Sequence, residues 1–162
     1  RKMPKRTGIL FEDDDVTLDR RVMENGEQRD RTVASGGSSY IRTTAALGEP
    51  VWQNAHYHKH TSEFYVVVTG WMAVAERHDG RDYVTVFWPG QTYMSRPGVH
   101  HNSLIKPGAD IDTLKYRVSQ LREGDKESDW HEADVDFNRW TKGLTLPKVA
   151  RLSATSLVDL KK

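Results

Sequence analysis

The chain has 162 residues, enough for one globular domain with extensions, and its 24 basic residues balance 23 acidic ones. That balance, without any basic stripe, gives no support for nucleic-acid binding, and no apolar run approaches the length that spans a membrane. Cysteine is absent, which excludes disulfides and thiolate ligands and suits a reducing cytoplasm, where we expect the protein to reside.

Residues 1–37 are expected to form an N-terminal arm that includes the first strands. The arm has a basic start, Arg1 to Arg6, followed closely by the acidic residues Glu12 to Asp15. Such a mixed run is typical of a solvated segment.

Short runs of β-branched and aromatic residues dominate the next part of the chain, residues 38–119. Glycine and proline turn signals separate the runs, and Asp79-Gly80 between two of them predicts a tight hairpin. The predicted strands are 39–46, 55–60, 63–68, 72–76, 83–88 and 112–119. Many short strands at regular spacing predict an all-β sandwich or barrel.

A first histidine cluster lies in the second predicted strand. His56 and His58 are two residues apart, so their side chains leave a strand on the same face. If a tight turn at residues 60–62 leads into a paired strand, Glu63 can face the same interior. Gly70 then ends that strand, at a turn where a side chain would be in the way.

The strand that begins at Glu63 is apolar on both faces. If Glu63 and Tyr65 point into the barrel, the alternate residues point outward, and such a face requires cover. Either the N-terminal arm lies across it or a second copy of the protein does. The outward residues are Phe64, Val66 and Val68.

A second cluster supplies one more imidazole. Gly90 and Pro97-Gly98 mark turns, and they deliver His101 from a strand distant in sequence. The two clusters together offer three imidazoles and one carboxylate, which suit a mononuclear site for Fe, Mn, Ni, Co, Cu or Zn. Two positions of an octahedron stay open for chemistry or ligand binding. We expect His60, in the turn, and His100, on the opposite strand face, to lie outside the ligand set.

At these residues the sequence resembles the cupin superfamily. The first cupin motif reads glycine, five residues, His-x-His, three or four residues, glutamate, six residues, glycine. The spacing matches at His56, His58, Glu63 and Gly70, whereas the leading glycine is displaced to Gly48.

The second cupin motif reads glycine, five residues, proline-x-glycine, two residues, histidine, three residues, asparagine. Gly90, Gly98 and His101 match it. Arg96 stands at the proline position, and Ile105 stands at the asparagine position.

The resemblance implies a jelly-roll β-barrel over residues 38–119. It also implies a divalent metal ion as cofactor, held by the ligand set His56, His58, Glu63 and His101. Because cupins are commonly dimers, it favours a homodimer.

Two classes of function fit this pattern. The first is an enzyme acting on a small polar metabolite: a dioxygenase or other oxidoreductase with iron, or an isomerase or epimerase with another divalent metal. Glu63 and Tyr65, which share the inward face, are the candidate catalytic residues. The second is a non-catalytic cupin that binds a metal and a small molecule such as a sugar. A further titratable side chain near the open positions, from Tyr65, His60 or Glu76, would favour the enzyme.

The pocket lining can be sketched by strand alternation. On the strand 39–46, either the set with Arg42 or the set with Ile41 and Thr43 points inward, and the pattern does not choose. If Arg42 is interior, it is a candidate to hold a substrate carboxylate or phosphate. On the last predicted strand the apolar set is expected inside, namely Leu114, Tyr116 and Val118.

Residues 120–162 are predicted to be an extension packed on the barrel. Apolar residues recur there at helical spacing, Asp129 with Glu132 suggests a capping box, and Gly143 suggests a stop. We therefore expect an amphipathic helix whose buried stripe is Trp130, Ala133, Phe137 and Trp140.

Overall fold

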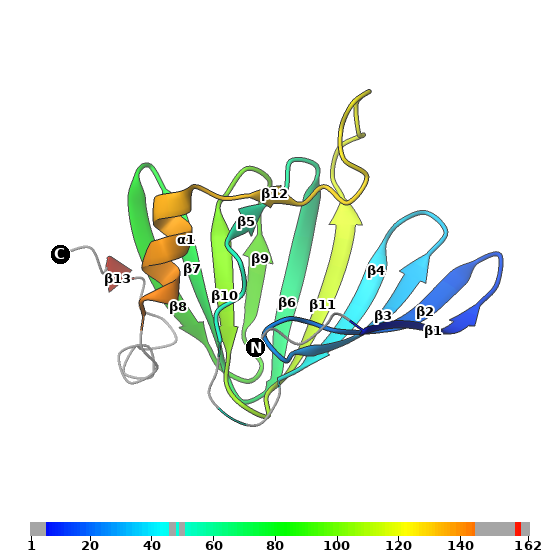
Figure 1. Cartoon of the computed structure of the whole chain (residues 1–162), viewed down its shortest axis with the longest axis horizontal. Coiled ribbons are helices and arrows are strands. Elements are labelled where there is room, and N and C mark those ends of the chain that lie inside the picture. The colour runs from blue at the N-terminus through cyan, green and yellow to red at the C-terminus, as the bar shows by residue number, and fades with distance from the viewer. Residues whose placement is uncertain (1–5, 46–47, 49–50, 145–157, 160–162) are drawn as a thin grey trace.

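The computed structural model describes residues 6–45, 48, 51–144 and 158–159, and it consists of two antiparallel sheets and one short helix (Figure 1). The expected all-β jelly-roll architecture is confirmed. The seven-stranded sheet has the order β1-β2-β3-β4-β11-β6-β9, and the six-stranded sheet has the order β12-β5-β10-β7-β8-β13.

The first sheet contains β1 (Arg6–Glu12), β2 (Val16–Val22), β3 (Gln28–Ala34), β4 (Ser39–Thr44), β6 (Thr61–Thr69), β9 (Thr92–Ser95) and β11 (Asp110–Arg117). The second contains β5 (His56–Tyr57), β7 (Met72–His78), β8 (Arg81–Phe87), β10 (His101–Ile105), β12 (His131–Glu132) and β13 (Val158–Asp159). Each of the six predicted strands overlaps an observed one.

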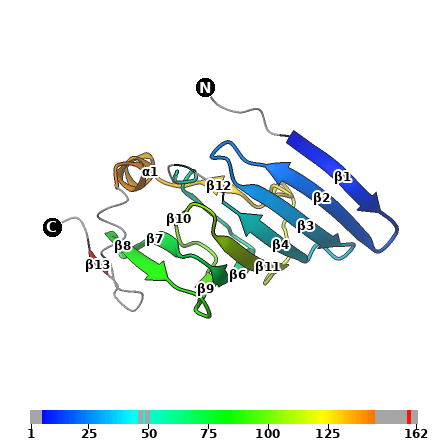
Figure 2. The ribbon, with the colours of Figure 1, turned by 90° about the horizontal axis from the view of Figure 1, so that it is seen from below.

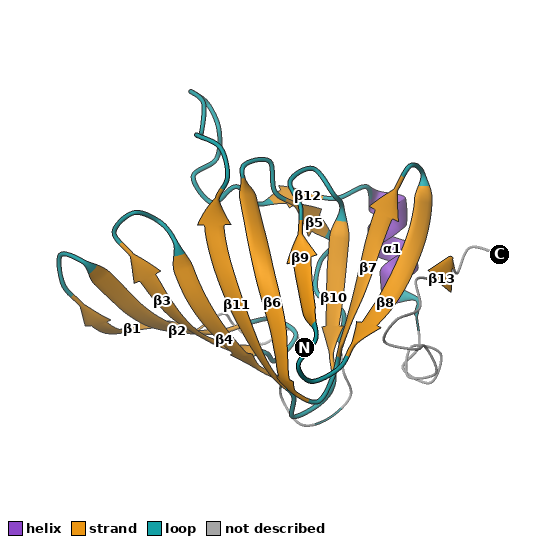
Figure 3. Cartoon of the chain, turned by 180° about the vertical axis from the view of Figure 1, so that it is seen from behind, coloured by secondary structure: helices purple, strands orange, loops and turns teal. Residues whose placement is uncertain are grey.

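The N-terminal arm is more ordered than its charge pattern suggested. Strands β1 to β3 continue the edge of the first sheet, pairing in order up to β4 (Figures 2 and 3). The described part of the arm, from residue 6 on, therefore does not lie across the outward face of β6, contrary to one of the two expectations. Within the described part of the chain that face stays open, with Phe64, Val66 and Val68 exposed by 38, 37 and 43%.

Turn chemistry at two predicted positions has a direct steric reason. Asp79 and Gly80 both have positive φ, 50° and 74°, and they join β7 to β8 in the predicted hairpin. Gly70 has φ of 81°, and an added Cβ there would lie 2.6 Å from the Cβ of Ala109. Only glycine fits this turn after β6.

The structure decides between the two faces left open for β4, and it overturns the expectation for β11. On β4, Ile41 and Thr43 are buried, whereas Arg42 points outward and forms an ion pair with Asp110 at 2.8 Å. On β11 the expectation that the apolar set is interior is wrong, since Leu114 and Val118 are 55 and 50% exposed. The inward residues are Thr113, Lys115 and Arg117, because β11 pairs with β6 in the register Thr113↔Tyr65, Lys115↔Glu63 and Arg117↔Thr61.

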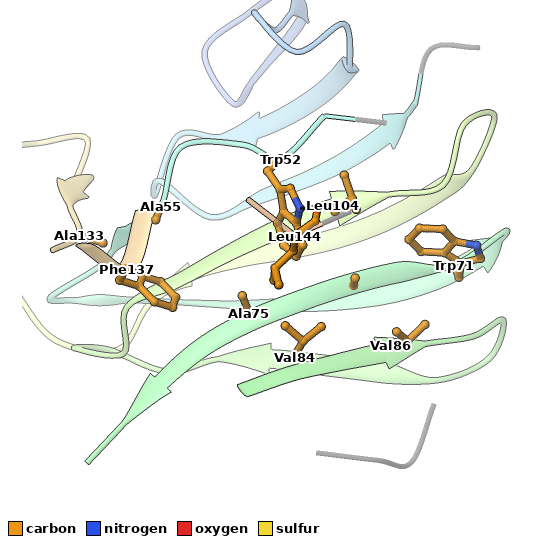
Figure 4. Close-up of a cluster of buried hydrophobic side chains, with 11 residues drawn as sticks. Trp52, Ala55, Trp71, Ala75, Val84, Val86, Leu104, Ala133, Phe137 and Leu144 are labelled. Atoms are coloured by element: carbon orange, nitrogen blue, oxygen red, sulfur yellow. Dashed lines mark hydrogen bonds between the residues drawn. The ribbon is translucent and has the colours of Figure 1, made fainter. Parts of the chain in front are cut away.

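Two hydrophobic cores hold the sheets. One lies on the face of the second sheet that the helix covers, where the fully buried Phe137 belongs to one cluster with Trp52, Leu104 and Val84 (Figure 4). The other lies between the sheets and consists of Val67, Met72, Val74, Tyr93, Ile105, Ala109 and Ile111. This second core fills one end of the barrel interior, and polar residues line the other end.

The C-terminal helix is shorter than its apolar spacing predicted. Helix α1 spans Val135–Lys142, its N-cap is Asp134, and Gly143 ends it as expected. Asp129 is not a cap: it is buried with φ of 48°, and the chain after it runs extended through β12. Among the described residues no helix is long and apolar enough to cross a bilayer.

Candidate metal centre

Three histidines from two strands converge inside the barrel. His56 begins β5 and lies directly opposite His101, the first residue of β10, while His58 follows β5. All three side chains are buried, and one ligand atom from each lies within 4.8 Å of the others. Ligands of a metal bound at about 2.1 Å lie about 3 Å apart, so small side-chain rotations suffice to close the set on an ion.

Each of the three imidazoles is oriented in the same way. The Nδ1 atoms of His56, His58 and His101 lie 2.8, 2.8 and 2.9 Å from the backbone carbonyl oxygens of Asn54, Asp129 and Val99. A carbonyl only accepts, so each Nδ1 carries a proton, which leaves Nε2 as the nitrogen that a metal would bind. Nε2 of His101 is buried without a hydrogen-bond partner, and Nε2 of His58 is buried with a carboxylate oxygen of Glu63 2.9 Å away. A metal ion would satisfy the unpaired nitrogen and accept both the imidazole and the carboxylate as ligands, so the residues fit a metal.

Burial keeps His56 and His101 neutral. Desolvation holds the pKa of His56 well below its ordinary value, and it lowers the pKa of His101 to about 4. Neutral imidazole is the form that binds a metal.

Glu63 enters the site from β6. Its Oε1 lies 2.9 Å from Nε2 of His58 and 3.8 Å from the ammonium of Lys115. Burial would raise the pKa of this carboxyl, but the contacts with His58, Lys115 and Tyr65 outweigh it and hold the pKa well below the usual range. The hydroxyl of Tyr65 donates a hydrogen bond to Oε2 of Glu63. Burial, together with the charge of Glu63, raises the pKa of Tyr65 well above 10, so Tyr65 carries its proton.

Asp129, which the sequence pattern assigned to a helix cap, supports the turn at residues 59–61 instead. Its carboxylate accepts hydrogen bonds from the backbone N–H groups of Lys59 and His60 at 3.0 and 2.7 Å and from the Thr61 hydroxyl at 2.8 Å. Its own carbonyl orients His58. No spacing rule links Asp129 to residues 58–61, because the contact joins segments about seventy residues apart.

The neighbouring histidines lie outside the cluster. His60 turns toward the loop after β11, where its Nδ1 is 2.7 Å from the Ser119 hydroxyl and its Nε2 is 2.9 Å from Asp125. His100 stacks on the ring of Tyr57 at 4.6 Å between centroids. Trp130, expected in a helical stripe, stacks on His56 at 5.4 Å and is partly exposed above the site.

A cavity adjoins the metal centre and shares Glu63 and Tyr65 with it. Polar groups line it from both sheets, with Gln53, Thr43, Thr113 and Ser103 among them. Arg29, from β3 in the N-terminal arm, also lines it, a role that the sequence pattern assigned to no residue of that arm. Glu76, named in advance as a possible acid, is partly buried on β7, and burial raises its pKa.

Comparisons with known proteins find structures but not sequences. No family model and no curated protein matches the chain. Oxalate decarboxylase from Bacillus subtilis superposes with a TM-score of 0.54 at 14% identity, over 96% of this chain and 42% of that one. KdgF from Halomonas sp. gives 0.46 at 17% identity, over 59% and 81%. An oxalate oxidase gives 0.46 at 18% identity, over 56% and 50%. The chain thus spans about two fifths of the oxalate decarboxylase chain that it matches.

Proposed function

The chain has the cupin fold, and we propose that its barrel holds a divalent metal ion at which a small polar metabolite is oxidised or isomerised. One observation carries this proposal. Three buried imidazoles have Nδ1 fixed by backbone carbonyls, and one ring nitrogen of each lies within 4.8 Å of the others. Such preorientation is typical of metal-ligating histidines, and a purely structural histidine needs no such shared arrangement.

Glu63 completes the proposed ligand set, with His56, His58 and His101. Its carboxylate oxygen lies 2.9 Å from His58 Nε2, a separation typical of two ligands at adjacent corners of one coordination sphere. Fe, Mn, Ni, Co, Cu and Zn all accept imidazole with carboxylate. B. subtilis oxalate decarboxylase has Mn(II) centres, so a protein of this fold holds such an ion.

Tyr65 favours an enzyme over a binding module. An enzyme that moves protons requires a second titratable group beside the open metal positions. Tyr65 meets this requirement because it lines the cavity and its hydroxyl donates a hydrogen bond to Glu63. The metal would supply Lewis acidity toward a bound oxygen ligand. Glu63 and Tyr65 would hold or deliver the proton, and the buried barrel would limit the entry of water.

The test begins with elemental analysis of protein purified without added metal. About one divalent ion per chain is expected, and absence of metal after reconstitution with each of the six ions would refute the proposal. Oxygen consumption with a panel of hydroxy and keto acids identifies an oxidoreductase, and solvent-deuterium incorporation into the same compounds identifies an isomerase. Tyr65→Phe is the matched variant, because it removes only the hydroxyl. A metal-loaded protein that binds compounds but turns over none would be the non-catalytic binding module.

A further inference from the structure

The inner face of the first sheet carries a concentration of positive charge beside the metal centre. We call it the basic wall and define it as Arg21 on β2, Arg29 and Arg31 on β3, and Lys115 on β11. Arg31 is satisfied by Asp19, with its two nitrogens 2.8 and 2.6 Å from the two carboxylate oxygens. The other three cations of the basic wall make longer contacts with their acidic neighbours.

Arg21 and Arg29 lie directly opposite each other in the β2–β3 pairing. Like charges in that position repel and destabilise a sheet. Arg29 in turn lies opposite Thr43 of β4, and Thr43 lies opposite Ile111 of β11, both of which are buried in the barrel. The arginine pair therefore belongs to the inner face of the sheet that bounds the cavity.

Both arginines keep a buried donor without a partner. The Nε atoms of Arg21 and Arg29 are buried and make no hydrogen bond. The carboxylate nearest Arg21 Nε is Asp19, at 3.8 Å, and it is already occupied by Arg31. Arg29 is held by Glu27 through Nη2 at 3.3 Å, and Gln53 also donates to Glu27 at 2.9 Å. An unsatisfied guanidinium edge is a site that a carboxylate or phosphate can bind.

The balance of positive and negative side chains around the cavity also favours an anionic ligand. Glu63 is the acid facing Lys115, and the proposed function assigns Glu63 to the metal. The four cations of the basic wall then have only two acids to balance them, Asp19 and Glu27, and a divalent metal ion would add two more positive charges.

We propose that Arg29, supported by Arg21, binds an oxyanion of the substrate, which is therefore an organic acid or phosphate ester. Only one part of this inference rests on the proposed function, namely that the same ligand also contacts the metal. It replaces the hypothesis that Arg42 plays this part, because Arg42 lies on the opposite face of the sheet and is paired with Asp110. The N-terminal strands thus form part of the binding site, with Arg29 selecting the charge of the substrate.

The experiment measures binding of malonate and of inorganic phosphate by calorimetry, to metal-loaded and to chelator-treated protein. Arg29→Gln and Arg21→Gln should each weaken binding by about tenfold or more, as expected for the loss of charge-assisted hydrogen bonds. Arg20→Gln is the matched control, because Arg20 is on the outer face of β2 and pairs with Asp30. It should bind as the wild type does. Arg29→Lys keeps the charge but not the fork and should fall between wild type and Arg29→Gln.

Equal affinities in all variants, or no binding of either anion at millimolar concentration, would overturn the proposal. Tighter binding of malonate assigns the wall to carboxylates, and tighter binding of phosphate assigns it to phosphate esters. The chelator-treated arm separates the two proposals. Anion binding that depends on Arg29 in a protein that takes up no metal would refute the proposed metal enzyme and would still support anion binding by Arg29.

Discussion

Asp129 offers a quantitative test of how the C-terminal segment supports the turn at residues 59–61 beside the histidine cluster. Its side chain is 1% exposed, and it accepts hydrogen bonds from two backbone N–H groups and one hydroxyl of residues 59–61. Burial would raise its pKa, but these hydrogen bonds and the one from His131 outweigh burial and lower the pKa to about 2.

The change is Asp129→Asn, which removes the charge and keeps a residue that tolerates the positive φ of this position. A shift from 3.8 to about 2 corresponds to about 2 kcal/mol at neutral pH, since one pKa unit is worth about 1.4 kcal/mol. Because the folded pKa is the lower one, this stabilisation is present above pH 3.8 and is lost as the pH falls toward 2. We therefore expect Asp129→Asn to cost about 2 kcal/mol at pH 7 and about half of that at pH 3.

The measurement is urea unfolding of chelator-treated protein, followed by tryptophan fluorescence at pH 7 and pH 3. Glu127→Gln is the control, because Glu127 is an exposed acid of the same segment, and it should change the free energy of unfolding by no more than about 0.5 kcal/mol. Equal stability of Asp129→Asn and wild type at pH 7 would refute the reasoning. So would a deficit of the same size at both pH values.

Three further predictions concern the metal centre and the open sheet face. Alanine at His56, His58 or His101 should abolish stoichiometric metal binding, and Glu63→Ala should weaken metal binding more than Glu63→Gln. His60→Ala and His100→Ala should keep one ion per chain by mass spectrometry. Loss of metal in His100→Ala alone would show that the ligand register is wrong by one residue. Metal-loaded protein should melt above chelator-treated protein at pH 7, with a gap that shrinks as the pH falls below about 6.5 and protons compete for the imidazoles; identical melting would contradict the site. Light scattering at micromolar concentration should give a homodimer, and Phe64→Glu on the open face of β6 should give a monomer; a monomeric wild type would exclude this interface.

Several features could be predicted from sequence because they depend on neighbours along the chain. Alternation along a strand put His56 and His58 on one face, and turn chemistry located Gly70 and the Asp79-Gly80 hairpin. The register at His101 rather than His100 followed from spacing in the second motif, and the structure brings the ring of His101 to the other two.

Other features depend on which strands become neighbours, and the sequence pattern missed or misassigned them. Leu114 was expected inside because apolar residues usually are, but the pairing of β11 with β6 sets Lys115 against Glu63 and turns Leu114 outward. The interior beside Glu63 is lined by polar groups, which reverses the usual burial preference. The predicted helix was too long for a related reason. Asp129 binds the turn at residues 58–61 and Trp130 stacks on the ring of His56, so neither residue belongs to the helix.

The sequence by itself thus determined the β architecture and the three-histidine cluster, because alternation and turn geometry act over a few residues. Only the tertiary structure decided what surrounds that cluster. Arg29 reaches the cavity through the order β3-β4-β11-β6, and Asp129 reaches His58 across about seventy residues. These contacts arise from closure of the sheets into a barrel, which joins segments that no local pattern relates.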